Sequence, residues 1–191
     1  MKAAYFTDFM DTLETEQQRL AQVKQASGAD QVLAIMSGNY LQNGQPAAEP
    51  MESRLEKAKQ IGVNQILELP LYTCLSSVGI YGYSTSNLIT NAKDIDVLVL
   101  ESLDASYAQL LDIAYVLIRN EKTFQKRLAA YKQSGMTFYQ AQAKAIEDGL
   151  PGGEKIMLAP RNVLAVECIK SLKYMYSSVK CMCIPEVSDF W

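Results

Sequence analysis

Short apolar runs alternate with amphipathic stretches along most of the chain. Six runs have the length of a β-strand, and most are continuously apolar, which is typical of strands that are covered by helices on both faces. The runs are residues 3–6, 31–36, 65–69, 96–100, 155–158 and 181–184. Helical patterns between them are predicted for residues 14–27, 51–61, 75–91 and 162–176. This alternation predicts a parallel α/β sheet with right-handed crossovers.

Residues 104–148 carry no strand pattern. Three successive helical patterns cover 104–120, 121–133 and 136–148, so we expect a helical insert near 104–148. The segment 149–153, rich in glycine and proline, is expected to return the chain to the sheet.

Polar residues follow several of the predicted strands, at the edge where such sheets bind ligands. The candidate ligand-binding residues there are Thr7, Asp8, Ser37, Gly38, Asn39, Arg161 and Asn162. Gly38 would let backbone N–H groups approach an anion, and the guanidinium of Arg161 suits a phosphate or carboxylate. Turn chemistry explains residues 37–39 more simply, and helix capping by Asn162 or a solvated Arg161 stays equally open.

The composition restricts the chemistry. The 191 residues contain no histidine, which excludes a Ser/His/Asp triad and an imidazole base. Asp8 and Asp11 form a possible carboxylate pair, but they lie where an apolar run gives way to polar sequence, and aspartate is common in the turns found there. The four cysteines lack a C-x-x-C spacing, so we expect buried reduced thiols, including Cys181 and Cys183, and no metal site.

Charge and hydropathy narrow the class of protein further. With a net charge of −3, the chain does not resemble a strong nucleic-acid binder. The N-terminus carries no signal-peptide or membrane-spanning pattern, so we expect a cytoplasmic protein.

Several segments resemble the tRNA(Met) cytidine acetate ligase family, in order and spacing. They are MKAAYF, GADQVLAIMSGNYLQNGQPA, IGVNQILELPLYTCLSS, SGMTFYQAQAKAIE and APRNVLAVECIKSLK. The resemblance spans nearly the whole chain and is most specific in MSGNYLQNGQPA and ILELP. It implies a Rossmann-like, nucleotidyltransferase-like sheet of the HxGH superfamily. It also implies a function in tRNA modification, in which acetate is activated with ATP and then transferred to a cytidine of tRNA(Met).

The family's ATP-binding segment is altered here. The resemblance places its two histidines, which bind phosphates, within a stretch of the type E-Y-N-P-F-H-N-G-H. The corresponding residues are TDFMDTLETE. With one deletion allowed, Leu13 and Glu16 replace the histidines and Thr15 replaces the glycine. Leucine cannot donate to a phosphate, and a carboxylate would repel one.

Other family elements are partly kept. The F-G-S-E element is replaced by VLVLESL without glycine, whereas P-N-N survives as Pro160, Arg161 and Asn162. Arg54 matches a family arginine, although the lysine three residues before it has become Met51. The family continues with a further arginine-bearing helical portion. On this comparison we expect one nucleotidyltransferase-like domain over 1–191, without the family's C-terminal portion.

The main hypothesis from these losses is a catalytically degenerate homologue, a pseudoenzyme that acts as a binding or regulatory module. The alternative is a diverged nucleotidyltransferase or nucleotide-binding enzyme that uses Arg161, Arg54 and the Ser37–Asn39 loop. ATP and Mg²⁺ remain possible ligands only through the family resemblance. The expected partner is a nucleotide or another phosphorylated small molecule. We expect no membrane contact and no tRNA contact, although a basic strip over Lys122–Lys132 keeps a tRNA-binding remnant as a weaker hypothesis. A homo-oligomer stays open, and so does docking of the aromatic pair Phe190–Trp191.

Overall fold

The computed structural model describes residues 1–187 and contains one five-stranded parallel sheet with the strand order β3-β2-β1-β4-β5. The strands are β1 (Lys2–Phe6), β2 (Gln31–Ser37), β3 (Gln65–Leu69), β4 (Val97–Ser102) and β5 (Lys180–Pro185). The strand order reverses between β1 and β4. Ligands of open parallel sheets bind at the carboxyl ends of the strands on either side of such a reversal.

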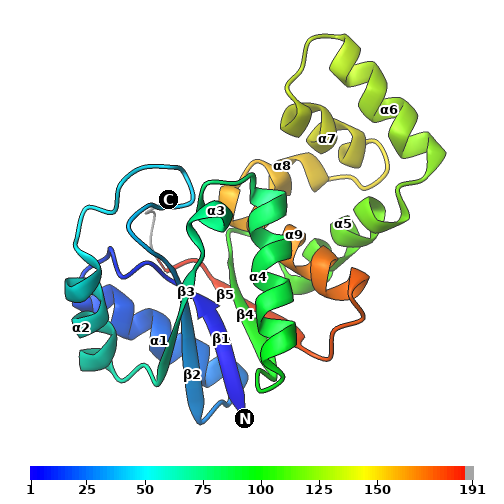
Figure 1. Cartoon of the computed structure of the whole chain (residues 1–191). Helices are drawn as coiled ribbons and strands as arrows, with labels where there is room; N and C mark the ends of the chain where they lie inside the picture. The colour runs from blue at the N-terminus through cyan, green and yellow to red at the C-terminus, as the bar shows by residue number, and fades with distance from the viewer. Residues whose placement is uncertain (188–191) are drawn as a thin grey trace.

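Helices cover both faces of this sheet (Figure 1). They are α1 (Leu13–Ser27), α2 (Met51–Ile61), α3 (Leu71–Cys74), α4 (Val78–Ala92), α5 (Tyr107–Arg119), α6 (Lys122–Gln133), α7 (Phe138–Glu147), α8 (Gly153–Met157) and α9 (Pro160–Tyr174). Helices α1 and α2 lie on one face, whereas α4 and α9 lie on the other. Helices α6 and α7 pack on each other and project away from the sheet (Figure 1).

Two apolar cores form because successive strand residues point to opposite faces of the sheet. On β1, Ala3 and Tyr5 pack in the core under α1 and α2, whereas Ala4 packs in the core under α4 and α9. Both faces of the central strands are buried. This double coverage explains why their sequences are continuously apolar.

Local sequence signals set the ends of helix α1. The Thr12 side chain accepts a hydrogen bond of 3.2 Å from the backbone N–H of Thr15, and Gly28 ends the helix with a φ of 66°. A residue with positive φ after a helix is most often glycine, because it lacks a Cβ. Capping boxes at Ser106 and Thr137 begin α5 and α7 in the same way.

The α/β fold with a helical insert is confirmed, since α5, α6 and α7 fill the 104–148 region. One predicted strand is wrong, because residues 155–158 belong to helix α8 and the turn after it. Gly152, with a φ of 88°, starts this helix, and Ile156 and Met157 are buried in the core beside α7 and α9. A five-residue helix is too short to show a helical period, so its apolar residues resembled a strand. The 149–153 segment therefore leads to α8 instead of returning to the sheet.

The other predicted helices form, with changes in detail. Gly79 and Gly82 do not prevent α4, because both pack against Glu167 of α9. Within residues 1–187, no helix is both long and apolar enough to cross a membrane. The expectation of a single domain over 1–191 stays a prediction, and Phe190–Trp191 lies outside the described residues.

Candidate ligand-binding site

A cavity of about 550 Å³ lies at the carboxyl edge of the sheet, next to the end of β1. Four segments form its wall: the turn after β1, the start of α1, the loop between β2 and α2, and the start of α9. The lining residues are Phe6, Thr7, Asp8, Met10, Asp11, Glu16, Arg19, Leu41, Gln42, Asn43, Pro160 and Arg161. Its size is in the usual range for small-molecule sites, about 300–1,000 Å³.

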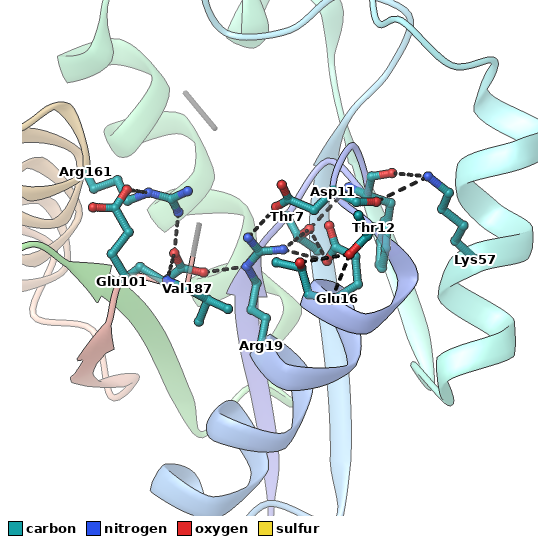
Figure 2. Close-up of polar contacts among 12 residues, drawn as sticks. Thr7, Asp11, Thr12, Glu16, Arg19, Lys57, Glu101, Arg161 and Val187 are labelled. Carbon is teal, nitrogen blue, oxygen red and sulfur yellow. Dashed lines mark hydrogen bonds and ion pairs between the residues drawn. The ribbon is translucent and has the colours of Figure 1, made fainter. Parts of the chain in front are cut away.

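Arg19 of α1 is the first of two arginines at this cavity. Its side chain is 3% exposed and binds three carboxylates: Glu16 at 2.6 Å, Asp11 at 2.7 Å and Glu101 at 2.5 Å. Figure 2 shows its guanidinium between Glu101 on one side and Asp11 and Glu16 on the other. Burial alone would lower the pKa of Arg19, but Glu16 and Glu101 raise it, so the guanidinium stays charged.

Arg161 of α9 is the second arginine, and it shares a carboxylate with the first. Glu101, at the end of β4, binds Arg19 through Oε1 and Arg161 through Oε2 (Figure 2). Arg161 also pairs with Glu186, which follows β5, and the backbone N–H of Val187 donates to Glu101 Oε2 at 3.3 Å. One connected set of charges therefore links α1, β4, α9 and the segment after β5.

Negative charge exceeds positive charge at this site. Asp8, Asp11 and Glu16 line the cavity together with the two arginines, and Glu101 and Glu186 lie behind the arginines. Five carboxylates thus surround two guanidinium groups. The surroundings favour a ligand with positive charge or hydrogen-bond donors over an anion.

Asp8 fixes the end of β2 from the floor of the cavity. Its carboxylate accepts hydrogen bonds from the backbone N–H of Ser37 at 2.6 Å and from Ser37 Oγ at 3.3 Å. Burial raises the pKa of the Asp8 carboxyl, whereas the Ser37 hydrogen bonds and the charge of Arg54 act to lower it.

Arg54 lies behind Asp8 and Ser37 and not among the residues that line the cavity. Its side chain is fully buried on α2 and donates to the backbone carbonyls of Asp8 at 3.4 Å, of Ser37 at 3.0 Å and of Gly38. Arg54 therefore holds the ends of β1 and β2 and the start of the following loop in place. A guanidinium can do this because its donors form a rigid fork.

The structure brings four of the residues singled out in the sequence to the cavity: Thr7, Asp8, Glu16 and Arg161. The other candidates, Ser37, Gly38, Asn39, Asn162 and Leu13, are not lining residues. Asn162 is buried and joins the α9 start to the chain after β4, through bonds to both backbone groups of Leu103 and to the Ile156 carbonyl. It does not cap α9, whose N-cap is Ala159.

Sequence reasoning missed Arg19 and Glu101. The pairing of Glu16 with Arg19, three positions apart on one helix, is the signal that could have found the arginine. Nothing local indicates Glu101, since its partner Arg19 is 82 residues away in the chain.

The basic strip and the cysteines lie outside this site. Lys122, Lys126 and Lys132 are exposed on α6, in the part that projects from the sheet. Cys74 and Cys168 are buried, and burial raises the pKa of Cys181 to about 12 and that of Cys183 to about 11. Thiols with such pKa values are poor nucleophiles and metal ligands at neutral pH. Within residues 1–187, no group of three or more carboxylate or thiol side chains could hold a metal ion.

A parallel sheet with a cavity at its carboxyl edge is the architecture of nucleotide-handling α/β proteins, and a sequence comparison now makes the class specific. The profile of the family described as HIGH Nucleotidyl Transferase matches residues 17–189, a range that begins just after Leu13 and Glu16. The chain belongs to this family.

Within that class, the similar curated proteins are tRNA(Met) cytidine acetate ligases. The one from Thermoanaerobacter sp. (strain X514) is 31% identical over 158 residues, covering 82% of this chain and 39% of the relative. The one from Caldicellulosiruptor saccharolyticus is 30% identical over 172 residues, covering 90% and 42%. The resemblance found in the sequence is thereby confirmed.

The solved structures agree on the fold. The crystal structure of Thermotoga maritima TmcAL bound with alpha-thio ATP has a TM-score of 0.90 at 22% identity, over 98% of this chain and 47% of that one. The apo form of the same protein also gives a TM-score of 0.90. The chain spans about two-fifths of the length of the curated relatives.

Proposed function

We propose that this chain is a member of the HIGH nucleotidyl transferase family that does not transfer nucleotides and acts as a binding or regulatory module. The observation that carries the proposal is the state of the two cavity arginines. Both are bound by carboxylates of the chain itself: Arg19 by three and Arg161 by two. A triphosphate would have to displace these carboxylates before it gained the guanidinium groups.

Glu16 gives the proposal independent support. On the family alignment, Glu16 stands where a phosphate-binding histidine belongs, and the structure places it in the wall of the cavity with its side chain 1% exposed. A buried carboxylate beside a developing phosphate charge opposes the electrostatic stabilisation on which adenylyl transfer depends.

The residues present do not fit ATP with Mg²⁺. The lining residues include no glycine and no lysine, so they offer neither a close backbone cradle nor a phosphate-binding ammonium group. Together with the two arginines that are already bound, this supports loss of adenylylation. Because the chain covers only part of its relatives, their acetate-ligating activity on tRNA(Met) does not transfer to it.

One observation favours the second candidate, a nucleotide-binding enzyme. Arg19 and Arg161 both line the cavity, so a nucleotide that displaced their carboxylate partners would meet two cations. Arg54 and the Ser37–Asn39 loop, which were first suggested for this role, contribute little, since Arg54 is committed to backbone carbonyls. This candidate predicts that ATP raises the melting temperature of the protein in a concentration-dependent way.

The test is acetate-dependent exchange of radioactive pyrophosphate into ATP, with a full-length tRNA(Met) cytidine acetate ligase as the positive control. We expect no exchange above background from this chain. The single substitution Glu16→His should not create exchange either, because the carboxylates around Arg161 remain. Exchange by the unaltered chain would disprove the proposal. ATP binding without exchange would support the second candidate.

A further inference from the structure

The acidic cavity adjoins a second pocket of different character. This pocket has a volume of about 250 Å³ and is lined by Gln42, Val78, Tyr139, Leu158, Pro160, Val163 and Leu164. Gln42 and Pro160 line both spaces, so the two form a composite cleft. One half is rich in carboxylates, and the other is lined mostly by aliphatic and aromatic side chains.

Glu16 has unused hydrogen-bonding capacity in the acidic half. Its Oε2 accepts from Thr7 Oγ1 at 2.8 Å and pairs with Arg19. Its Oε1 is buried and has no hydrogen-bond partner within the part of the chain that the structure describes. A buried carboxylate oxygen without a partner is costly, by about 1–3 kcal/mol or more. A ligand that donated a hydrogen bond there would remove this cost.

We propose that the composite cleft binds a small organic amine whose ammonium group enters the acidic half and whose apolar body occupies the pocket beside Leu158. Five carboxylates around two guanidinium groups supply the negative field, and an ammonium group supplies three donors and no acceptor. The apolar half accounts for the body of the ligand, because aliphatic walls gain affinity only from apolar groups.

This proposal rests on the proposed function, because it requires that the cleft does not serve as an ATP site. It goes further by naming the class of ligand. The total space suits a molecule of drug size or smaller.

The experiment titrates three probes into the purified protein by isothermal calorimetry. The probes are 4-phenylbutylamine, its uncharged analogue 4-phenylbutanol, and n-butylamine, which lacks the ring. We expect 4-phenylbutylamine to bind at least about tenfold more tightly than either analogue, since a hydrogen bond to a charged group is worth about one to two orders of magnitude in affinity.

Two substitutions separate the two halves of the cleft. Glu16→Gln should weaken 4-phenylbutylamine about tenfold and leave 4-phenylbutanol unchanged. Leu158→Ala, at a side chain that is 69% exposed, should weaken both ring-containing probes and leave n-butylamine unchanged. Glu14→Gln on the exposed side of the same helix is the matched control and should change nothing. Thermal unfolding verifies that each variant is folded.

Equal affinity of the amine and the alcohol would overturn the proposal. So would unchanged amine binding in a folded Glu16→Gln variant, or no binding of any probe. The pyrophosphate exchange assay on the same preparation separates the two proposals. Absence of both amine binding and exchange would reject the amine alone, whereas exchange would reject the proposed function.

Discussion

Glu16 Oε2 lies 2.6 Å from Arg19 Nη1, one helical turn away on α1, and both side chains are almost fully buried. An ion pair on an exposed helix face contributes only about 0.3–0.5 kcal/mol. This pair is removed from water and extends to Asp11 and Glu101. The cavity wall therefore depends on a network in which no member can be removed without leaving buried charge.

Removal of Arg19 should be strongly destabilising. In Arg19→Met, three carboxylates lose a buried partner, so we expect the free energy of unfolding to fall by about 3–5 kcal/mol. Urea unfolding followed by circular dichroism measures this change. Lys24→Met, on the exposed side of the same helix, serves as the control and should change stability by less than about 0.5 kcal/mol. A loss below about 1 kcal/mol in Arg19→Met would contradict the network.

Replacement of Arg54 by lysine should loosen the β2–α2 loop. Lysine keeps the charge but cannot reach the separate backbone carbonyls of Ser37 and Gly38 with a rigid fork. We expect Arg54→Lys to cost about 1–3 kcal/mol and to speed amide hydrogen exchange over residues 38–50. Lys59→Arg, at an exposed position of α2, should leave both quantities unchanged. Unchanged exchange in Arg54→Lys would exclude the clamping role.

Asp8 should make stability depend on pH in the direction opposite to a salt-bridged carboxylate. Burial raises its folded pKa, so between the unfolded pKa of about 3.9 and the folded pKa the folded state binds more protons. The contribution of Asp8 to stability therefore falls as the pH rises through this window. Relative to Asp8→Asn, the wild type should lose stability over that range. Urea unfolding of both proteins at a series of pH values tests the sign, and a difference that grows in favour of the wild type would refute it.

Ser37 should hold the Asp8 pKa down. Its hydroxyl donates to the ionised Asp8 carboxylate at 3.3 Å, which favours the charged form. In Ser37→Ala the Asp8 pKa should rise further above its usual value. Carbon-detected NMR titration of the Asp8 carboxyl measures this directly, with the exposed Asp104 as an internal reference. A lower midpoint in Ser37→Ala would contradict the assignment.

Gly82→Ala should separate α4 from α9. A Cβ at Gly82 would lie 3.0 Å from Glu167 Cβ and 3.2 Å from its carbonyl carbon, whereas one at Gly79 would meet only the end of the Glu167 side chain, at 3.4 Å. We expect Gly82→Ala to destabilise by about 1–3 kcal/mol. Gly79→Ala is the matched control and should be neutral or stabilising by up to about 1 kcal/mol, since alanine favours helix. Equal effects at both positions would show that the helices are free to move apart.

The sequence predicted the sheet well, because the parallel strands are buried on both sides and their apolar runs are unambiguous. It failed at residues 155–158, where a short buried helix and a strand have the same composition. It predicted a ligand-binding role for Arg54 from the resemblance to the family, because it could not show that this arginine shares the buried side of α2 with Ala58.

The candidate site was harder to predict than the fold. Thr7, Asp8 and Arg161 were expected at the carboxyl edge and do line the cavity. The charges that bind the arginines come from the ends of α1, β4 and β5, which are remote in sequence. Such pairings leave no local pattern, because only the folded topology brings them together.

The sharing of Glu101 between two arginines also has a consequence for the order of assembly. When the polypeptide is synthesised from its N-terminus, Arg161 leaves the ribosome before Glu186 does. The rim of the cleft can therefore close only after the last strand has joined the sheet, which makes ligand capture a late event in the birth of the protein.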